Sequence, residues 1–289
     1  MISEVGVLTI REVKKWVREP ILVFMMIIQP VIWLGLFGKA FNLTGLVSIP
    51  PELLNQLPPD ITAQIANIFN QMMGSIFGGT IDYFTYMAAG MLSVIILFTS
   101  MFSGMSVVWD RRFGFLNKLL VAPIARGSIV MAKVTSSVIR GIFQAALVFS
   151  IAFAFGLKVG DAFNLLDLIG IFAGLFLLSL GLSSLFIALT IRIKSWEAHM
   201  AVVNLLNLPL MFASSALFPI NQMPDWLQSV ARFNPISYSS DLFRTFILHS
   251  HSTGLDISKI ALNFEVLIGF AIIFSFIGIL LAERGLRKG

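Results

Sequence analysis

Long apolar runs without a charged residue alternate along this 289-residue chain with shorter polar segments. A helix needs about 20 apolar residues to cross the hydrocarbon core of a bilayer, which is about 30 Å thick. The runs predict six membrane-spanning helices, at about residues 21–41, 83–108, 129–157, 164–191, 198–218 and 262–282. The fifth is the least regular, because Pro209 and Pro219 interrupt it. The pattern predicts an all-α polytopic membrane protein, with residues 1–289 in a single transmembrane domain.

A basic amphipathic pattern precedes the first span, in residues 1–19. Four cations recur there at helical spacing, and Trp16 lies on the opposite, apolar face. The cations are Arg11, Lys14, Lys15 and Arg18. A helix of this kind lies in the membrane interface, in contact with lipid. The alternative is a helical extension of the first span.

The polar segment at residues 42–82 is long, and two Pro-Pro pairs punctuate it. Apolar residues then recur at helical spacing, namely Ile61, Ile65, Ile68, Phe69 and Met72. We expect an outer loop with an amphipathic helix whose apolar stripe packs on lipid or on a partner subunit.

A short basic and apolar segment separates the second and third spans. Arg111 and Arg112 open it, and Pro123 ends its helical part. An apolar stripe lies between them, formed by Phe115, Leu116, Leu119 and Leu120. A short amphipathic helix with an exposed apolar face suits docking into a groove on another protein. The alternative is a membrane-surface helix that only joins two spans.

Residues 219–235 contain three prolines and two aromatic residues typical of a membrane interface, Trp226 and Phe233. Broken backbone at membrane depth persists only where it is buried in protein or lines water. We therefore expect a re-entrant segment on the outer side. The candidate gate residues are Pro219, Trp226, Asn234 and Pro235.

Composition and charge support a membrane location. The chain is 57% hydrophobic and 12% charged, with a mean hydropathy of +0.90, which excludes a globular cytoplasmic enzyme. Fifteen Lys and Arg residues fall on one set of connecting segments and five on the other. The positive-inside rule then places both termini in the cytoplasm. We expect the membrane to be the plasma (inner) membrane. This distribution accounts for the net charge of +5 without nucleic acid.

Motifs for catalysis and nucleotide binding do not occur in the sequence. There is no G-x-x-x-x-G-K-S/T string, so we expect no ATP site, no bound cofactor and no enzymatic activity in this chain. His249 and His251 are two residues apart and cannot share a metal ion on a helix, so both are expected at the surface. His199 is expected to be solvated at the inner mouth of the fifth span.

None of the six apolar runs holds an Asp, Glu, Lys or Arg in its middle, which disfavours ion-coupled transport. A helical stripe in the second span instead offers an apolar candidate substrate path, formed by Phe98, Met101, Phe102 and Met105. The alternative is a packing or lipid-facing surface.

Three stretches together identify a family. They are Arg18-Glu19-Pro20 with Gln29-Pro30-Val31-Ile32-Trp33; Arg111-Arg112-Phe113-Gly114 with Leu119-Leu120-Val121-Ala122-Pro123 and Arg126; and Asn234-Pro235-Ile236-Ser237-Tyr238 with Arg244. Their order and the six-span layout resemble the permease subunit of ABC-2 type, or type V, ATP-binding-cassette exporters. Over nearly its whole length, the chain resembles the daunorubicin-resistance and nodulation-factor export permeases.

The resemblance implies that two copies of this subunit pair and dock two copies of a separate cytoplasmic ATPase, which binds ATP and Mg²⁺. It implies export of a hydrophobic or amphipathic substrate, such as a drug, lipid or glycolipid. A stand-alone carrier or channel is the alternative. The implied ATPase-coupling residues are Arg111, Arg112, Phe113, Gly114, Phe115, Leu116, Leu119, Leu120, Pro123 and Arg126. Many relatives carry E-x-G-T around the glycine, where this chain has Phe113-Gly114-Phe115.

If this segment couples to an ATPase, replacing Gly114 or Leu119 with Asp abolishes transport-coupled ATP hydrolysis and leaves membrane insertion intact. ATPase assays on membranes that contain equal amounts of each variant measure the effect. Unchanged hydrolysis would show that the coupling assignment is wrong.

Overall fold

The computed structural model describes residues 2–36, 83–193, 195–251 and 254–285, together with isolated positions between 38 and 68. The predicted outer loop at residues 42–82 therefore lies almost entirely outside the described residues. Helices account for most of the described chain, and no strand occurs in it. The all-α prediction is confirmed for this part of the protein.

The helices of the described ranges follow one another with short connections. They are α1 (Ile2–Val17), α2 (Pro20–Gly35), α6 (Tyr83–Arg112), α7 (Phe115–Val121), α8 (Arg126–Ala154), α9 (Leu165–Thr190), α10 (Trp196–Phe212), the 3-10 helix η2 (Ile220–Gln222), α11 (Asp225–Ala231), α12 (Pro235–Ile247) and α13 (Ile257–Gly285).

Four of these helices, α6, α8, α9 and α13, are long and apolar enough to cross a membrane. The helices at the first and fifth predicted spans are shorter, with 16 residues in α2 and 17 in α10. The six-span count therefore stays a prediction. Helix α10 passes through Pro209 and ends at Phe212, so Pro209 does not break it.

Helix starts follow local capping chemistry. Asn164 caps α9, and the Asp167 carboxylate accepts the backbone N–H of Asn164 in return, at 2.9 Å. Ser195 caps α10 through the N–H of Ala198. Asn234 caps α12 and Pro235 occupies its first position, where a missing N–H costs nothing.

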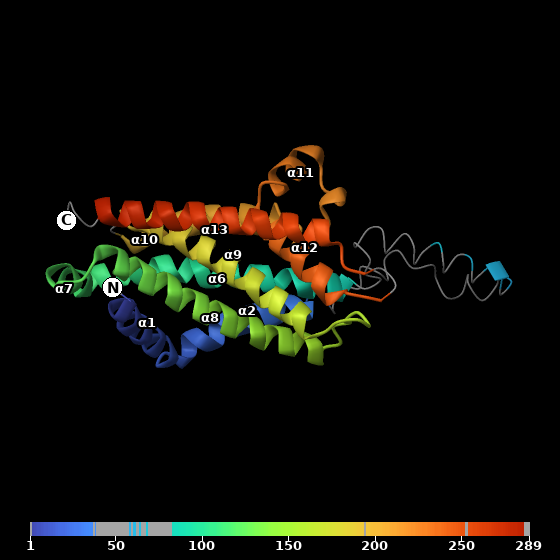
Figure 1. The fold of residues 1–289 in the computed structure, drawn as a ribbon, viewed down its shortest axis with the longest axis horizontal. Coiled ribbons are helices and arrows are strands. Elements are labelled where there is room, and N and C mark those ends of the chain that lie inside the picture. The colour runs from blue at the N-terminus through green and yellow to red at the C-terminus, as the bar shows by residue number, and fades with distance from the viewer. Residues whose placement is uncertain are drawn as a thin grey trace.

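The helices form an elongated bundle (Figure 1). Helix α1 begins and helix α13 ends at the end of the bundle that carries α7, which we call the α7 end, and α12 lies toward the opposite end, the α12 end. Helix α11 projects from the side of the bundle. Which end faces the cytoplasm stays a prediction.

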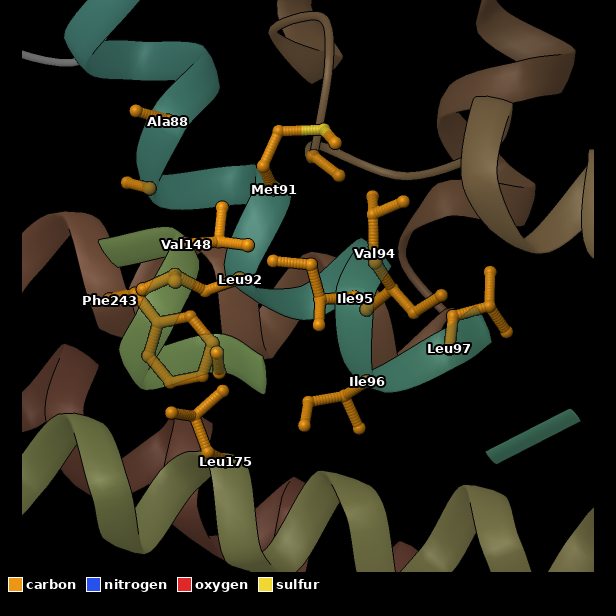
Figure 2. Packing of buried hydrophobic residues seen from close by; sticks show 14 of the residues in the cluster. Ala88, Met91, Leu92, Val94, Ile95, Ile96, Leu97, Val148, Leu175 and Phe243 are labelled. Atoms are coloured by element: carbon orange, nitrogen blue, oxygen red, sulfur yellow. The ribbon is translucent and has the colours of Figure 1, made fainter. Parts of the chain in front are cut away.

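Helix α6 occupies the centre of the bundle. Of its most apolar 18-residue window 89% is buried, against 17% for that of α13. It contacts α8, α9, α10 and α12. Figure 2 shows Leu92 and Ile95 of α6 gathered with Val148 of α8, Leu175 of α9 and Phe243 of α12. Because α6 is enclosed by protein, its side chains set how the other helices pack.

Gly90 of α6 allows the segment after α10 to lie directly against this central helix. A Cβ atom built at Gly90 would lie 1.9 Å from the carbonyl oxygen of Ala216, far inside contact distance. The close approach therefore requires glycine here.

Replacing Gly90 with Ala forces the Ala216 backbone away from α6. We expect a loss of about 1–3 kcal/mol in the free energy of unfolding, as in overpacked cores. The control is Gly269→Ala in α13, where a Cβ meets no atom within 4 Å and stability should not fall. Denaturant unfolding in detergent micelles measures both; equal stabilities would contradict the role of the contact.

Candidate functional site

Helix α1 packs along the first half of α8 at the α7 end. Leu8 and Trp16 are buried, and the Thr9 hydroxyl donates to the carbonyl oxygen of Ala132 at 3.4 Å. The Ser128 hydroxyl donates to the Glu4 carboxylate at 3.0 Å. The predicted amphipathic helix is present, and part of its apolar face covers α8. Its position in the membrane interface stays a prediction.

A buried cluster of charges joins α1, α6 and α8. The Lys133 ammonium, with its side chain only 3% exposed, lies 2.5 Å from Asp110 Oδ2 and 3.3 Å from Glu12 Oε1. It also donates to the hydroxyl of Ser106 at 3.0 Å. Arg11 adds a contact of 2.8 Å to Glu12 and one of 3.7 Å to Asp110. Each carboxylate is therefore shared between cations from two helices, which fixes α1 on the bundle.

Helix α7 begins after a left-handed turn at Gly114, where φ is +70°. Such a φ favours glycine strongly over residues that carry a Cβ. After this turn, Leu116 and Leu119 of α7 are buried in the protein. The Arg11 guanidinium lies 3.4 Å from the centre of the Phe115 ring. Helix α7 is therefore held by both apolar and cation–π contacts.

Two residues of the predicted docking stripe on α7, Leu116 and Leu119, face the interior of the protein and not a partner. Leu116 and Leu119 are 2% and 7% exposed, and they pack in one cluster with Leu8 of α1 and Ile129 of α8. The physical reason is that α1 and α8 supply the apolar cover that the sequence pattern assigned to a partner protein. The Leu120 side chain lies outside the described part of the chain.

Other residues between Arg111 and Arg126 are exposed and form what we call the free surface of the α7 segment. Phe113 is 77% exposed and Val121 is 88% exposed. Arg112, Lys118 and Pro123 are exposed as well, and Arg126 is partly exposed. Phe113 and Val121 therefore present apolar surface with cations nearby. Val121 belongs to the family motif but was not among the implied ATPase-coupling residues.

Arg111 and His199 hold the neighbouring connection between α9 and α10. The Arg111 guanidinium donates to the carbonyl oxygens of Ile193 at 2.8 Å and Ile191 at 2.6 Å. His199 is buried, with Nδ1 3.1 Å from the hydroxyl of Thr190. The prediction of a solvated His199 is wrong, because α10 turns this ring onto α9 and α6. Arg111 serves this connection rather than the free surface.

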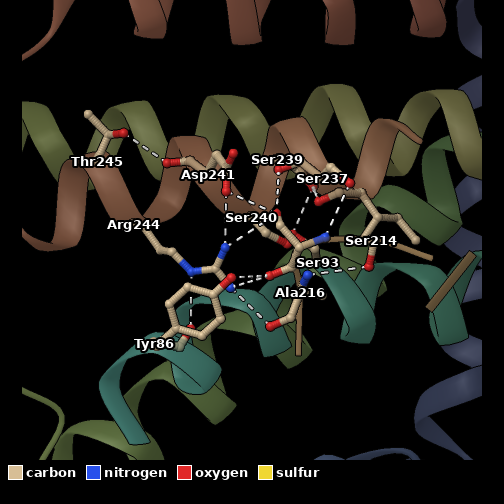
Figure 3. A network of polar contacts seen from close by, with 12 residues as sticks. Tyr86, Ser93, Ser214, Ala216, Ser237, Ser239, Ser240, Asp241, Arg244 and Thr245 are labelled. Carbon is tan, nitrogen blue, oxygen red and sulfur yellow. Dashed lines mark hydrogen bonds and ion pairs between the residues drawn. The ribbon is translucent and has the colours of Figure 1, made fainter. Parts of the chain in front are cut away.

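A second polar network lies toward the α12 end (Figure 3). Arg244, expected on an outer segment, is buried and donates to the carbonyl oxygens of Ser215 at 2.6 Å, Ala216 at 3.0 Å and Tyr86 at 3.2 Å. It also pairs with Asp241 at 3.1 Å and stacks over the Tyr86 ring at 3.5 Å. One side chain thus ties the segment after α10 to α6 and α12.

The four candidate gate residues do not gather in one place. Asn234 is buried and donates to the carbonyl oxygens of Leu210 at 2.8 Å and Ala213 at 2.7 Å, which joins the end of α10 to the start of α12. Pro235 and Pro219 are buried, whereas Trp226 on α11 is 69% exposed. Asn234 and Pro235 are parts of the packed structure, and a gating role stays a prediction.

His249 forms a pair that the sequence did not reveal. Its Nδ1 lies 2.8 Å from Oδ2 of the buried Asp167, 82 residues earlier in the chain. His249 is partly exposed, so it lies at the edge of the bundle with one polar partner, and His251 is exposed as predicted. The hydroxyl of Ser250 and the N–H of His251 bind the Asp161 carboxylate and hold its pKa below the usual range. Within the described residues, no three metal-binding side chains gather.

The stripe expected to form a substrate path divides into two environments. Phe98 and Met101 belong to the central core. Phe102 and Met105 instead line a pocket between α1, α6 and α8. The structure therefore favours packing for the first two residues and leaves the second two available for a ligand.

Comparisons with known proteins agree on one family. Residues 3–248 match the family described as ABC-2 type transporter. The chain is 30% identical to a protein of Cyanophora paradoxa named as transport permease ycf38, over 99% of this chain and 90% of that protein. It is 27% identical to Nodulation protein J of Rhizobium leguminosarum bv. trifolii, over 61% and 66% respectively. It is 26% identical to a protein of Escherichia coli K12 named as multidrug ABC transporter permease YbhR, over 61% and 47%.

The buried charge cluster should contribute to the stability of the protein. Replacing Lys133 with Met leaves Asp110 and Glu12 without their shared buried cation. We expect the free energy of unfolding in micelles to fall by about 3–5 kcal/mol. Lys118→Met, which removes an exposed cation from α7, should change it by no more than about 0.5 kcal/mol. A Lys133 variant as stable as the Lys118 variant would show that the cluster does not hold α1.

Proposed function

The chain belongs to the ABC-2 type transporter family, as its motifs predicted, and on that premise we propose that it is the permease subunit of an ATP-driven exporter. Membership implies that it is the membrane component of an ABC transporter, that it works with an ABC ATPase and that it dimerises. The finer proposal is a pair of identical permeases with two ATPase copies, in the plasma membrane, with both termini cytoplasmic.

The proposed substrate is hydrophobic or amphipathic. One relative is named as a multidrug permease, and each of the four long apolar helices of this chain has an 18-residue stretch with no more than two charged residues. Substrates of that class need no charged coordination site, in contrast to ions, which require polar or charged ligands to replace their hydration shell.

The observation that carries the coupling proposal is the exposed pair Phe113 and Val121 at the α7 end. Exposed aromatic residues beside cations are typical anchors at protein interfaces, because they bury large apolar areas at low conformational cost. The ATPase would therefore contact Phe113 and Val121, and not the buried Leu116 and Leu119 that the sequence pattern suggested.

The packing of α7 against α1 and α8 would allow α7 to transmit movement from the ATPase to these helices. Leu116 and Leu119 lie in the same cluster as residues of α1 and α8, and Phe115 lies under Arg11. Close-packed side chains transmit displacement because they have little room to deform. A push on Phe113 would thus move α1 and α8 together with α7.

The test separates coupling from folding. We expect Phe113→Asp to reduce ATP-driven export about tenfold or more in proteoliposomes that contain the permease and its ATPase. The reason is that a charge replaces an apolar side chain that the ATPase would bury on binding. Phe113→Leu, which keeps an apolar side chain, should retain most of the activity. Leu119→Asp is not a clean probe, because it places a carboxylate in the core of the α7 end.

Two outcomes would overturn the proposal. Export by Phe113→Asp at the rate of the unmodified permease would remove Phe113 from the coupling surface. Equal export by proteoliposomes that lack the ATPase would identify the chain as a stand-alone carrier or channel.

A further inference from the structure

A small pocket of about 40 Å³, open to the surface, lies where α1 meets α6 and α8. Both polar and apolar side chains form its wall. They are Glu12, Lys15, Trp16, Glu19, Phe102, Met105, Ser106, Trp109 and Arg140. The function proposed above uses no part of the pocket.

Arg140 is the unusual member of this wall. It lies in the middle of α8, within a candidate membrane span, and it is 7% exposed. Within the described part of the chain, its guanidinium donates one hydrogen bond, from Nε to the carbonyl oxygen of Ser136 on its own helix, at 3.2 Å. Burying a guanidinium at such a place is costly unless an anion accompanies it.

Trp16 supplies a second unsatisfied donor. The residue is 8% exposed, and its indole N–H has no acceptor among the described residues. The ring is held edge-on against Phe143, with 5.8 Å between ring centres. A buried N–H without a partner in the protein is rare, because leaving it unpaired costs free energy. A hydrogen bond to a bound ligand would remove that cost.

The pocket wall holds two cations, Lys15 and Arg140, and two carboxylates, Glu12 and Glu19. Glu12 is already shared by Lys133 and Arg11, at 3.3 and 2.8 Å. Lys15 lies 4.0 Å from Asp110, which Lys133 also neutralises. Arg140 also interacts electrostatically with Glu12, so it shares this carboxylate with Lys133 and Arg11. An anionic group of a ligand would give the Arg140 guanidinium a partner of its own.

The opposite part of the wall is apolar. Phe102 and Met105 come from α6, and the ring of Trp109 stands one helical turn beyond them. A hydrated inorganic anion gains nothing from such surfaces. An amphiphile gains from both sides, because its acyl chain buries apolar area while its anionic group meets Arg140.

We propose that this pocket binds the phosphate group of a phospholipid, with Arg140 and the Trp16 indole N–H as donors and with Phe102 and Met105 against the acyl chain. The bound lipid would hold α1 on α6 and α8 by supplying an anionic group to Arg140 and an acceptor to the Trp16 indole N–H. This site is independent of the molecule that the transporter exports, and it assigns a role to Phe102 and Met105 other than packing.

Binding to the delipidated, full-length protein in neutral detergent micelles tests the proposal. The probes are phosphatidylglycerol, a diacylglycerol without the phosphate, and inorganic phosphate alone, and retained lipid is measured by native mass spectrometry. We expect phosphatidylglycerol to bind and to raise the melting temperature. The diacylglycerol and inorganic phosphate should bind at least about tenfold more weakly.

Variants then locate the site. Arg140→Gln should weaken phosphatidylglycerol binding about 10- to 100-fold, and Trp16→Phe, which keeps the ring packing, about two- to tenfold. Glu19→Gln should strengthen it, because it removes a negative charge from the wall, and a merely structural role would not produce this opposite sign. Arg232→Gln, at an exposed arginine outside the pocket, should have no effect.

Three results would overturn the proposal. Binding by Arg140→Gln equal to that of the unmodified protein would place the lipid elsewhere, and Trp16→Phe provides the same test should Arg140→Gln not fold. Equal binding of the diacylglycerol would remove the phosphate from the interaction. Equal binding of inorganic phosphate would make the site an anion site without lipid specificity.

Discussion

The structure depends on the enclosure of α6 by the surrounding helices. Polar groups on an enclosed helix have no water to bind, so they must find partners on the neighbouring helices. Ser93 of α6 lies 2.7 Å from the hydroxyl of Ser239 and 3.0 Å from that of Ser240, both on α12. Ser183 of α9 donates to Ser100 of α6 at 3.1 Å. These contacts hold α12 and α9 in one register along α6, and Thr99 hydrogen-bonds to Gln144 of α8 in the same way.

Charged residues complete this arrangement at two separate places. Lys133 joins α1, α6 and α8 toward the α7 end, and Arg244 joins α6, α12 and the segment after α10 toward the other end. Because each cation has partners on several elements, a movement that starts at one element is shared by its neighbours. This is the property that a transporter needs if force applied at α7 is to reach a substrate inside the bundle.

The sequence predicted the class of the protein well. Apolar runs, cation placement and the motifs around Gly114 and Asn234 indicated a helical ABC-2 permease, and the family comparison confirms it. These features are local, because a run of apolar residues or a glycine turn needs no knowledge of distant residues. Gly114, for example, takes the left-handed φ that its residue type allows.

The details that depend on contacts between distant segments could not be predicted. Periodicity showed that Leu116 and Leu119 share a face of α7, but it could not show that Leu8 of α1 covers them. The pairing of His249 with Asp167 joins residues 82 positions apart. Lys133 and Arg244 were counted as topology signals, because their burial follows only from the way the helices assemble.

The central claim is that the free surface at Phe113 meets the ATPase, and single-cysteine cross-linking measures it most directly. The sequence contains no cysteine, so Phe113→Cys introduces the only thiol of the chain. Phe233→Cys, at a residue that is 89% exposed near the start of α12, is the matched control. With a short bifunctional reagent and the co-expressed ATPase, the account predicts a cross-link from position 113 and none from position 233. A cross-link from position 233, or none from position 113 in an assembled complex, would contradict it.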